Sequence, residues 1–290
     1  MIPASPDLKE TQNPDGGWGY RRGSGSWTEP TCYALLALAA EGRFASDEVR
    51  RGIKWLEVRQ RADGGWAPRD GVDESTWVTA LLLLLPADLV QRVNADHAVS
   101  WLLSQTGRES GFVQRLRSRL LGVQVDASQA LEGWPWFPGA AAWVTPTALT
   151  TLALQKLNRR TANRDIGERI AEGQAFLLSR RCKDGGWNHG STKALGYDSD
   201  SYPETTGIAL LALHDVRNKA TATAEDLAQK QLATCGSLEG ACWLTLALSA
   251  RDRVLNADLA SIKTQHPSTT EVALSALTRA AIAGHNLFLE

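Results

Sequence analysis

The stretch Gln12-Asn13-Pro14-Asp15-Gly16-Gly17-Trp18 recurs almost unchanged along the chain. Gln60-Arg61-Ala62-Asp63-Gly64-Gly65-Trp66 is a second copy, and Arg181-Cys182-Lys183-Asp184-Gly185-Gly186-Trp187 is a third, with Arg in place of Gln. Weaker echoes run from Gln105 to Phe112 and from Gln129 to Trp134. Such repetition indicates one structural unit used several times, so the way these units stack decides the fold.

The repeated turn has a physical interpretation. Glycine tolerates positive φ, which allows a helix to end in a tight turn. The Asp side chain accepts hydrogen bonds from nearby backbone N–H groups, and the Gln amide can tie further backbone groups. We therefore predict that Trp18, Trp66 and Trp187 are structural staples that lock the corners. The 11 tryptophans, against five Phe and four Tyr, agree with a repeated demand for Trp.

Two kinds of helix are predicted to alternate between the turns. Amphipathic helices are expected over residues 47–61, 96–105 and 165–181, with Asp47 and Asp96 as N-caps. Helices that are apolar nearly all round, and hence buried on most sides, are expected over residues 31–40, 77–85, 146–157, 205–213, 241–250 and 271–282.

This alternation predicts an all-α fold, an α/α toroid of about six helix hairpins. An inner ring of apolar helices would be wrapped by an outer amphipathic ring, in a single domain over residues 1–290. An open solenoid of the same hairpins is the alternative. Closure is favoured because a solenoid does not need inner helices this apolar, and its end repeats should carry polar caps.

Composition excludes several classes of partner. The net charge is −1, from 31 basic and 32 acidic residues, so no nucleic-acid partner is predicted. The local run Arg115, Arg117 and Arg119 is interpreted as a solvated helix face. The apolar run 80–87 is too short for a transmembrane segment, and the first residues lack a signal-peptide layout. We therefore expect a soluble, cytoplasmic protein.

Family resemblance rests on the turns and on the residues that open the apolar helices. Trp27-Thr28-Glu29-Pro30-Thr31 and Trp143-Val144-Thr145-Pro146-Thr147 each lead into an Ala/Leu helix, and Gly133-Trp134-Pro135-Trp136 lies between two turns. With the repeated turn, these segments resemble the squalene–hopene cyclase and protein prenyltransferase β-subunit superfamily over roughly residues 10–285. The resemblance implies an α/α toroid, and it implies function less strongly because one fold hosts many functions.

The cyclase side of this resemblance implies acid-initiated cyclisation, with the proton donor in an Asp-Xaa-Asp-Asp-Thr motif at an inner-helix start. The closest segment here is residues 197–206, which lacks the full motif. Its alignment on the following Ala/Leu helix places Glu204 at the proton donor, with Asp198 and Asp200 as supporting carboxylates. The alternative is that Glu204, after Pro203, simply favours the positive end of a helix.

Aromatic and acidic side chains at the predicted inner-helix starts suit an apolar, isoprenoid-like small molecule, and no cofactor is predicted. The expected ligand-binding residues are Trp27, Glu29, Tyr33, Trp77, Trp143, Tyr202 and Trp243.

Three other hypotheses remain open. A ligand-binding or scaffold toroid without catalysis is one, and a carbohydrate-active α/α-barrel enzyme that uses Glu29 and Glu204 is another. The prenyltransferase side of the resemblance implies a zinc site and a separate α-subunit. Its nearest local match is Glu239-Gly240-Ala241-Cys242, whose spacing differs, so no metal is predicted and Cys242 is expected to be a core thiol. Whether a protein partner is needed stays undecided.

Two stretches, residues 107–142 and 188–202, are longer than a repeat connection should be. Both precede predicted inner helices, so we expect both at one end of the barrel, and we expect this to be the functional end.

Overall fold

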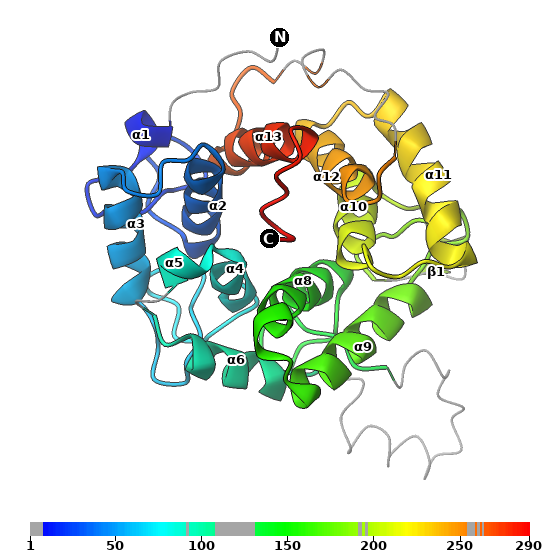
Figure 1. Cartoon of the computed structure of the whole chain (residues 1–290), viewed down its shortest axis with the longest axis horizontal. Helices are drawn as coiled ribbons and strands as arrows, with labels where there is room; N and C mark the ends of the chain where they lie inside the picture. Colours follow the sequence, from blue (N-terminus) through cyan, green and yellow to red (C-terminus); the bar gives the residue numbers. More distant parts are fainter. Residues whose placement is uncertain are drawn as a thin grey trace.

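The computed structural model describes residues 8–90, 93–107, 131–190, 193–194, 197–253, 259, 262 and 264–290. These residues form a ring of helices in two layers (Figure 1). The arginine run 115–119 and most of the long connection 107–142 lie outside the described residues.

The inner layer closes on itself. Each inner helix packs against the next, and α13 packs against α2, which completes the ring (Figure 1). A closed toroid is therefore confirmed over an open solenoid, and the inner helices are nearly all-apolar as predicted. In the described part of the chain this layer consists of α2 (Thr28–Ala40), α4 (Thr79–Leu84), α8 (Val144–Thr161), α10 (Pro203–Ala212), α12 (Leu238–Ser249) and α13 (Thr269–Ile282).

The outer layer is amphipathic. In α3, for example, Val49 and Ile53 are buried whereas Arg50 and Lys54 are exposed. A short α1 (Leu8–Thr11) contacts α13, and α5 (Ala87–Val90) follows α4. The longer outer helices are α3 (Asp47–Glu57), α6 (Ala95–Ser104), α9 (Arg164–Ser179) and α11 (Lys219–Thr234).

The predicted N-caps Asp47 and Asp96 are wrong. Ser46 caps α3 by accepting from the backbone N–H of Val49 at 3.3 Å, and Asn94 caps α6 by accepting from that of His97 at 3.0 Å. Both aspartates lie in the first turn instead, where a carboxylate still interacts favourably with the helix dipole.

The turn tryptophans are staples, as predicted. The side chains of Trp18, Trp66 and Trp187 are fully buried. Each indole N–H donates to a leucine carbonyl ten residues earlier, at 2.7, 2.9 and 2.6 Å respectively. The preceding Asp accepts from the backbone N–H of the second glycine in every copy, and the first glycine has φ between 93° and 101°.

The described residues of the two weak echoes, 105–107 and 131–134, together form one further turn. The indole N–H of Trp134 donates to the carbonyl of Leu102 at 2.8 Å, as in the regular copies, but across 32 positions instead of ten. The backbone N–H of Gly107 donates to the carbonyl of Gly133 at 3.1 Å, which joins the two halves. Residues 108–130, between them, lie outside the described residues. The two parts of this turn are separated along the chain by inserted residues, so the sequence does not display it as one continuous copy of the repeat.

A ladder of hydrogen bonds fixes the starts of the inner helices at one end of the ring. The backbone N–H groups of Thr28, Trp77, Val144 and Thr269 donate to the carbonyls of Pro68, Trp136, His189 and Tyr20, at 2.9 to 3.1 Å. Each acceptor lies two residues after the turn Trp of another repeat. The bond from Thr269 to Tyr20 closes the circle between the last helix and the first turn.

Two short strands were not predicted from the sequence. β1 (Lys193–Ala194) pairs antiparallel with β2 (Tyr197–Asp198), in the loop before α10. Two residues per strand are too few to leave an alternating pattern. No helix within the described ranges is long and apolar enough to span a membrane.

Candidate functional site

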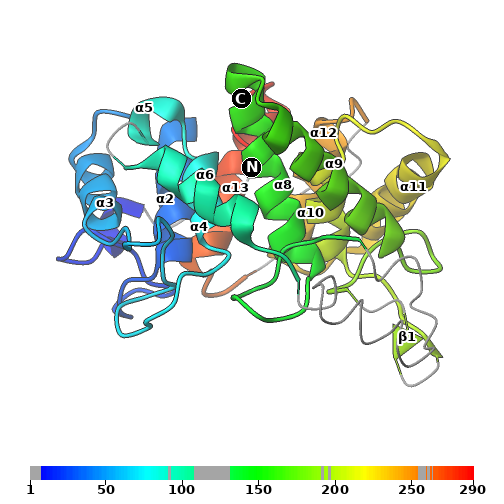
Figure 2. The same ribbon diagram turned by 90° about the horizontal axis from the view of Figure 1, so that it is seen from below.

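Acidic side chains gather where the inner helices begin. Glu29, Glu204 and Glu239 are each the second residue of their helix, in α2, α10 and α12. Negative side chains are stabilised there by the positive end of the helix dipole. In Figure 2 the β1 hairpin that precedes α10 lies on the lower side of the ring, and the C-terminal end lies on the upper side. We call Glu29, Glu204 and Glu239 the acidic cluster.

Glu29 has the most perturbed carboxyl of the cluster. Its pKa is raised to about 7, chiefly by burial and also by the nearby charge of Glu239, while a hydrogen bond from Tyr20 acts in the opposite direction. The Tyr20 hydroxyl donates to Oε2 of Glu29. Tyr20 is itself held by the bond from Thr269 to its carbonyl, so ring closure places this donor.

Glu239 is the second carboxyl with a shifted pKa. Burial raises this pKa, the charges of Glu204 and Glu271 raise it further, and the Trp243 indole lowers it. Glu239 nevertheless remains exposed, so protein surrounds the group on several sides while water still reaches it. Glu271 is engaged elsewhere, because its carboxylate accepts from the backbone N–H of Ser268 at 2.7 Å in a capping box.

Glu204 lies against the start of α12. A Cβ placed on Gly240 would come within 3.0 Å of its Oε1 and within 2.9 Å of the Cβ of Pro203. Glycine at position 240 therefore permits this close approach of α10 and α12. The approach is what brings the charge of Glu204 near Glu239.

Asp198 and Asp200 are not brought into the cluster. Asp198 lies in β2, is exposed, and forms an ion pair with Lys183 at 3.2 Å. Asp200 is exposed in the loop that leads to α10. Of the three carboxylates predicted from residues 197–206, only Glu204 lies at an inner-helix start.

The predicted aromatic residues form two groups: one around the inner-helix starts, which we call the rim, and a buried group inside the ring, which we call the floor. At the rim, Trp27 packs edge-on against Tyr20 at 5.4 Å and Trp77 packs against Trp136 at 5.0 Å. Also at the rim, Trp143 and Tyr202 are 38% and 48% exposed and flank the His189 ring at 6.3 and 5.4 Å.

The floor is formed by Tyr33 and Trp243, which are both buried and lie 6.2 Å apart. Burial, and then the charges of Glu29 and Glu239, raise the pKa of the Tyr33 hydroxyl. The floor and the acidic cluster are therefore close enough to interact electrostatically.

Several residues of this region were not predicted. Tyr20 and His189 are both the second residue after a turn Trp, which is a signal the sequence carries. Glu239 is at the second helical position, as Glu29 and Glu204 are, and this shared position is a further signal. Phe288, whose ring lies 5.3 Å from Trp243, carries no pattern that could have identified it.

The zinc hypothesis finds no ligand set in the described residues. Cys242 is fully buried, as expected of a core thiol, and its Sγ lies 3.8 Å from the Ser275 hydroxyl. No group of three His, Cys, Asp or Glu side chains within these residues is arranged to hold a metal ion.

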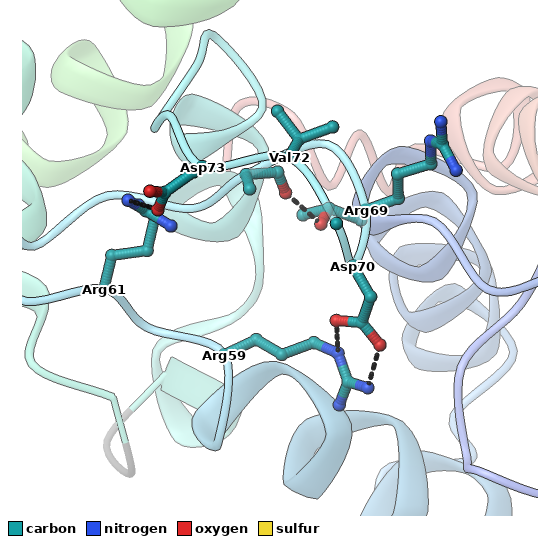
Figure 3. Close-up of a pocket in the computed structure, with 9 residues that line it drawn as sticks. Arg59, Arg61, Arg69, Asp70, Val72 and Asp73 are labelled. Carbon is teal, nitrogen blue, oxygen red and sulfur yellow. Dashed lines mark hydrogen bonds and ion pairs between the residues drawn. The ribbon is translucent and has the colours of Figure 1, made fainter.

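A cavity of about 430 Å³ lies beside the rim, next to Thr28, and four of its five charged side chains already form ion pairs with one another. Arg59 binds Asp70 through two hydrogen bonds of 3.0 and 2.7 Å, and Arg61 binds Asp73 at 2.7 Å (Figure 3). Arg69 points away from both pairs (Figure 3), and its guanidinium lies 5.1 Å from the Trp27 ring. This cavity is therefore not our candidate site.

Similarity to known proteins agrees with the geometry. The family model of the squalene–hopene cyclase C-terminal domain matches residues 2–76. A squalene–hopene cyclase of Zymomonas mobilis subsp. mobilis is 39% identical over 70 residues, which cover 20% of this chain and 11% of that protein. A drimenyl diphosphate synthase of Streptomyces showdoensis is 27% identical over 220 residues, which cover 73% of this chain and 36% of that protein. The matched region thus spans about a third or less of either relative.

Structural likeness supports the fold alone. A GH76 alpha-mannanase of Bacteroides thetaiotaomicron superposes with a TM-score of 0.56 at 11% identity, over 91% of this chain and 88% of that one. At such identity the likeness says nothing about substrate. The sequence matches, the closed ring and its repeated Trp turn together make this chain similar to the squalene–hopene cyclase-like superfamily.

Proposed function

We propose that the chain acts on an isoprenoid or similar apolar ligand at the acidic end of the inner ring, with the carboxyl of Glu29 as proton donor. The observation that carries this proposal is the environment of Glu29. Its pKa of about 7 keeps a proton available near neutral pH. The Glu29 carboxyl also interacts with the rim through its bond from Tyr20, and with the floor through its electrostatic effect on Tyr33.

The chemistry follows from this environment. Transfer of the proton to an alkene breaks the O–H bond of Glu29, forms a C–H bond and leaves a carbocation on the ligand. The Tyr20 hydroxyl stabilises the carboxylate that remains. The faces of Trp27 and Trp243 can stabilise the cation. Return of a proton from the ligand to Glu204 or Glu239 ends the reaction as an isomerisation with no net loss of atoms.

We place the donor at Glu29 rather than at Glu204 because Glu29 combines a raised pKa with a positioned hydroxyl partner. In this proposal Glu204 is the supporting carboxylate, since its charge helps to raise the pKa of Glu239. The exposed Asp198 and Asp200 have no part in proton transfer. The names of the two enzyme relatives support a terpenoid substrate.

A ligand-binding toroid without turnover is the second candidate. The observation in its favour is the packed floor, because Tyr33, Trp243 and Phe288 are at most 3% exposed. A catalyst must admit its substrate past or beside these rings, whereas a binding protein can hold a ligand at the rim.

The test is conversion and binding of squalene and farnesol by the wild type, Glu29→Gln and the control Glu10→Gln, which changes an exposed glutamate on α1. We expect product formation that falls at least about 100-fold in Glu29→Gln and is unchanged in Glu10→Gln, because general acid catalysis contributes roughly 10²–10⁴-fold. Full activity in Glu29→Gln would show that another group is the donor. Binding without conversion by the wild type would establish the second candidate, and no binding would overturn both.

A further inference from the structure

The segment His285–Glu290 enters the ring from the end opposite the acidic cluster. After α13, Gly284 adopts a φ of 96°, a left-handed conformation that turns the chain away from the helix axis. The segment then runs toward the centre of the ring (Figure 1) and lies on its upper side in Figure 2.

Apolar side chains of this segment are packed as core residues. Phe288 is fully buried and Leu287 is 8% exposed. The Phe288 ring lies 5.3 Å from Trp243, which in turn lies 6.2 Å from Tyr33. The three rings form a row from α2 through α12 to the segment, so Phe288 backs the floor of the candidate site.

Polar contacts between the segment and the ring are made to backbone carbonyls. Lys156 Nζ in α8 donates to the carbonyl of Leu287 at 2.7 Å and to that of Leu84 at 2.8 Å. The side-chain amide of Asn286 donates to the carbonyl of Leu246 in α12 at 3.3 Å. A bound molecule with apolar groups at the centre could replace the side chains of the segment without breaking any helix.

Space is available next to the segment. A cavity of about 430 Å³ at this end is lined by His285, Leu287 and Glu290, together with Lys156, Arg160 and Phe44. The segment can therefore shift outward from the centre into a volume that is already open. Its pivot, Gly284, has nothing within 4 Å of where a Cβ would stand.

We propose that the position held by Phe288 and Leu287 is a deep apolar subsite for a hydrocarbon chain, and that the segment His285–Glu290 occupies it as an intramolecular competitor. This inference rests on the proposed function, since it concerns the same ligand. Binding of the hydrocarbon and docking of the segment exclude one another. The observed affinity is therefore the intrinsic affinity multiplied by the fraction of molecules in which the segment is undocked.

The experiment measures farnesol binding by equilibrium dialysis for the wild type, Phe288→Ala and Val58→Ala. Val58 is 62% exposed at the end of the outer helix α3, so it controls for the loss of an apolar side chain away from the centre. We expect the dissociation constant to fall at least tenfold in Phe288→Ala and to stay within twofold in Val58→Ala. Equal or weaker binding by Phe288→Ala would overturn the competitor while the proposed function stands. Absence of binding by every protein would overturn the proposed function and this inference together.

A second measurement does not depend on the stability of Phe288→Ala. Glu290→Cys is labelled with a nitroxide in a Cys235→Ser background, because the other three cysteines are buried and Cys235 is only half-buried. Farnesol should increase the mobility of the label if it displaces the segment. A label whose mobility is unchanged at saturating farnesol would contradict displacement.

Discussion

Glu29 shows how one residue in the cluster makes the stability of the fold depend on pH. Its pKa is about 7 in the folded chain, against 4.5 for an ordinary glutamate. Between these values the folded state holds a proton that the unfolded state has lost. The contribution of Glu29 to stability is therefore fully present below pH 4.5 and is lost as the pH rises through 7.

Glu29→Gln should remove this dependence. At pH 8 we expect the variant to be more stable than the wild type by about 2 kcal/mol, a value reduced for the solvent contact of a half-buried group. Near pH 4 the difference should vanish. Urea unfolding at both pH values measures it. In Glu239→Gln the free energy of unfolding should depend less on pH than in the wild type, because this change removes one charge that raises the pKa of Glu29. An equal stability change at pH 4 and pH 8 would contradict the raised pKa.

At the scale of one element, the Asp-Gly-Gly-Trp turn depends on close packing as much as on backbone conformation. Gly64 has a φ of 93°, and a Cβ at this position would lie 2.5 Å from the carbonyl oxygen of His97 in α6. Gly71 has a similar φ of 82° but nothing within 4 Å. The two glycines therefore separate backbone strain from steric clash.

Gly71→Ala should cost about 1 kcal/mol of unfolding free energy, the strain of a left-handed alanine. Gly64→Ala should cost about 3 kcal/mol or more, because α6 must also move away from the turn. Urea unfolding of both variants gives the comparison. Equal losses would mean that α6 shifts without cost, and that the turn does not lock the outer helix in place.

The sequence predicts elements like this turn because their chemistry is local. Asp63, Gly64 and Trp66 are neighbours, so the pattern and its hydrogen bonds recur together. The acidic cluster is only partly predictable, because Glu239 meets Glu29 after some 200 residues of intervening chain have closed the ring. Tyr20 reaches its place through a bond from Thr269, and Phe288 through a turn after α13. Apart from the place of Tyr20 two residues after a turn Trp, none of these encounters leaves a periodic signal.

At the scale of the whole molecule, one seam of the ring has no covalent connection. Helices α2 and α13 lie at opposite ends of the chain, yet they pack side by side (Figure 1). The Thr269 hydroxyl donates to the carbonyl of Gly19 across this seam at 2.6 Å. The Thr28 hydroxyl makes the matching bond to Ala67, also at 2.6 Å, between repeats that the chain itself connects.

Thr269→Val and Thr28→Val therefore remove the same bond in two topological settings. Each should lower the free energy of unfolding by about 1 to 2 kcal/mol, because a carbonyl loses its donor. Their native-state hydrogen exchange should differ. Only Thr269→Val loosens a contact that no linker holds together, so amides of α2 and α13 should exchange faster at the seam while the other inner helices stay protected. Faster exchange throughout the ring in both variants would mean that the toroid opens as a single unit. The Tyr20–Glu29 contact beside the seam would then be no weaker than contacts elsewhere in the ring.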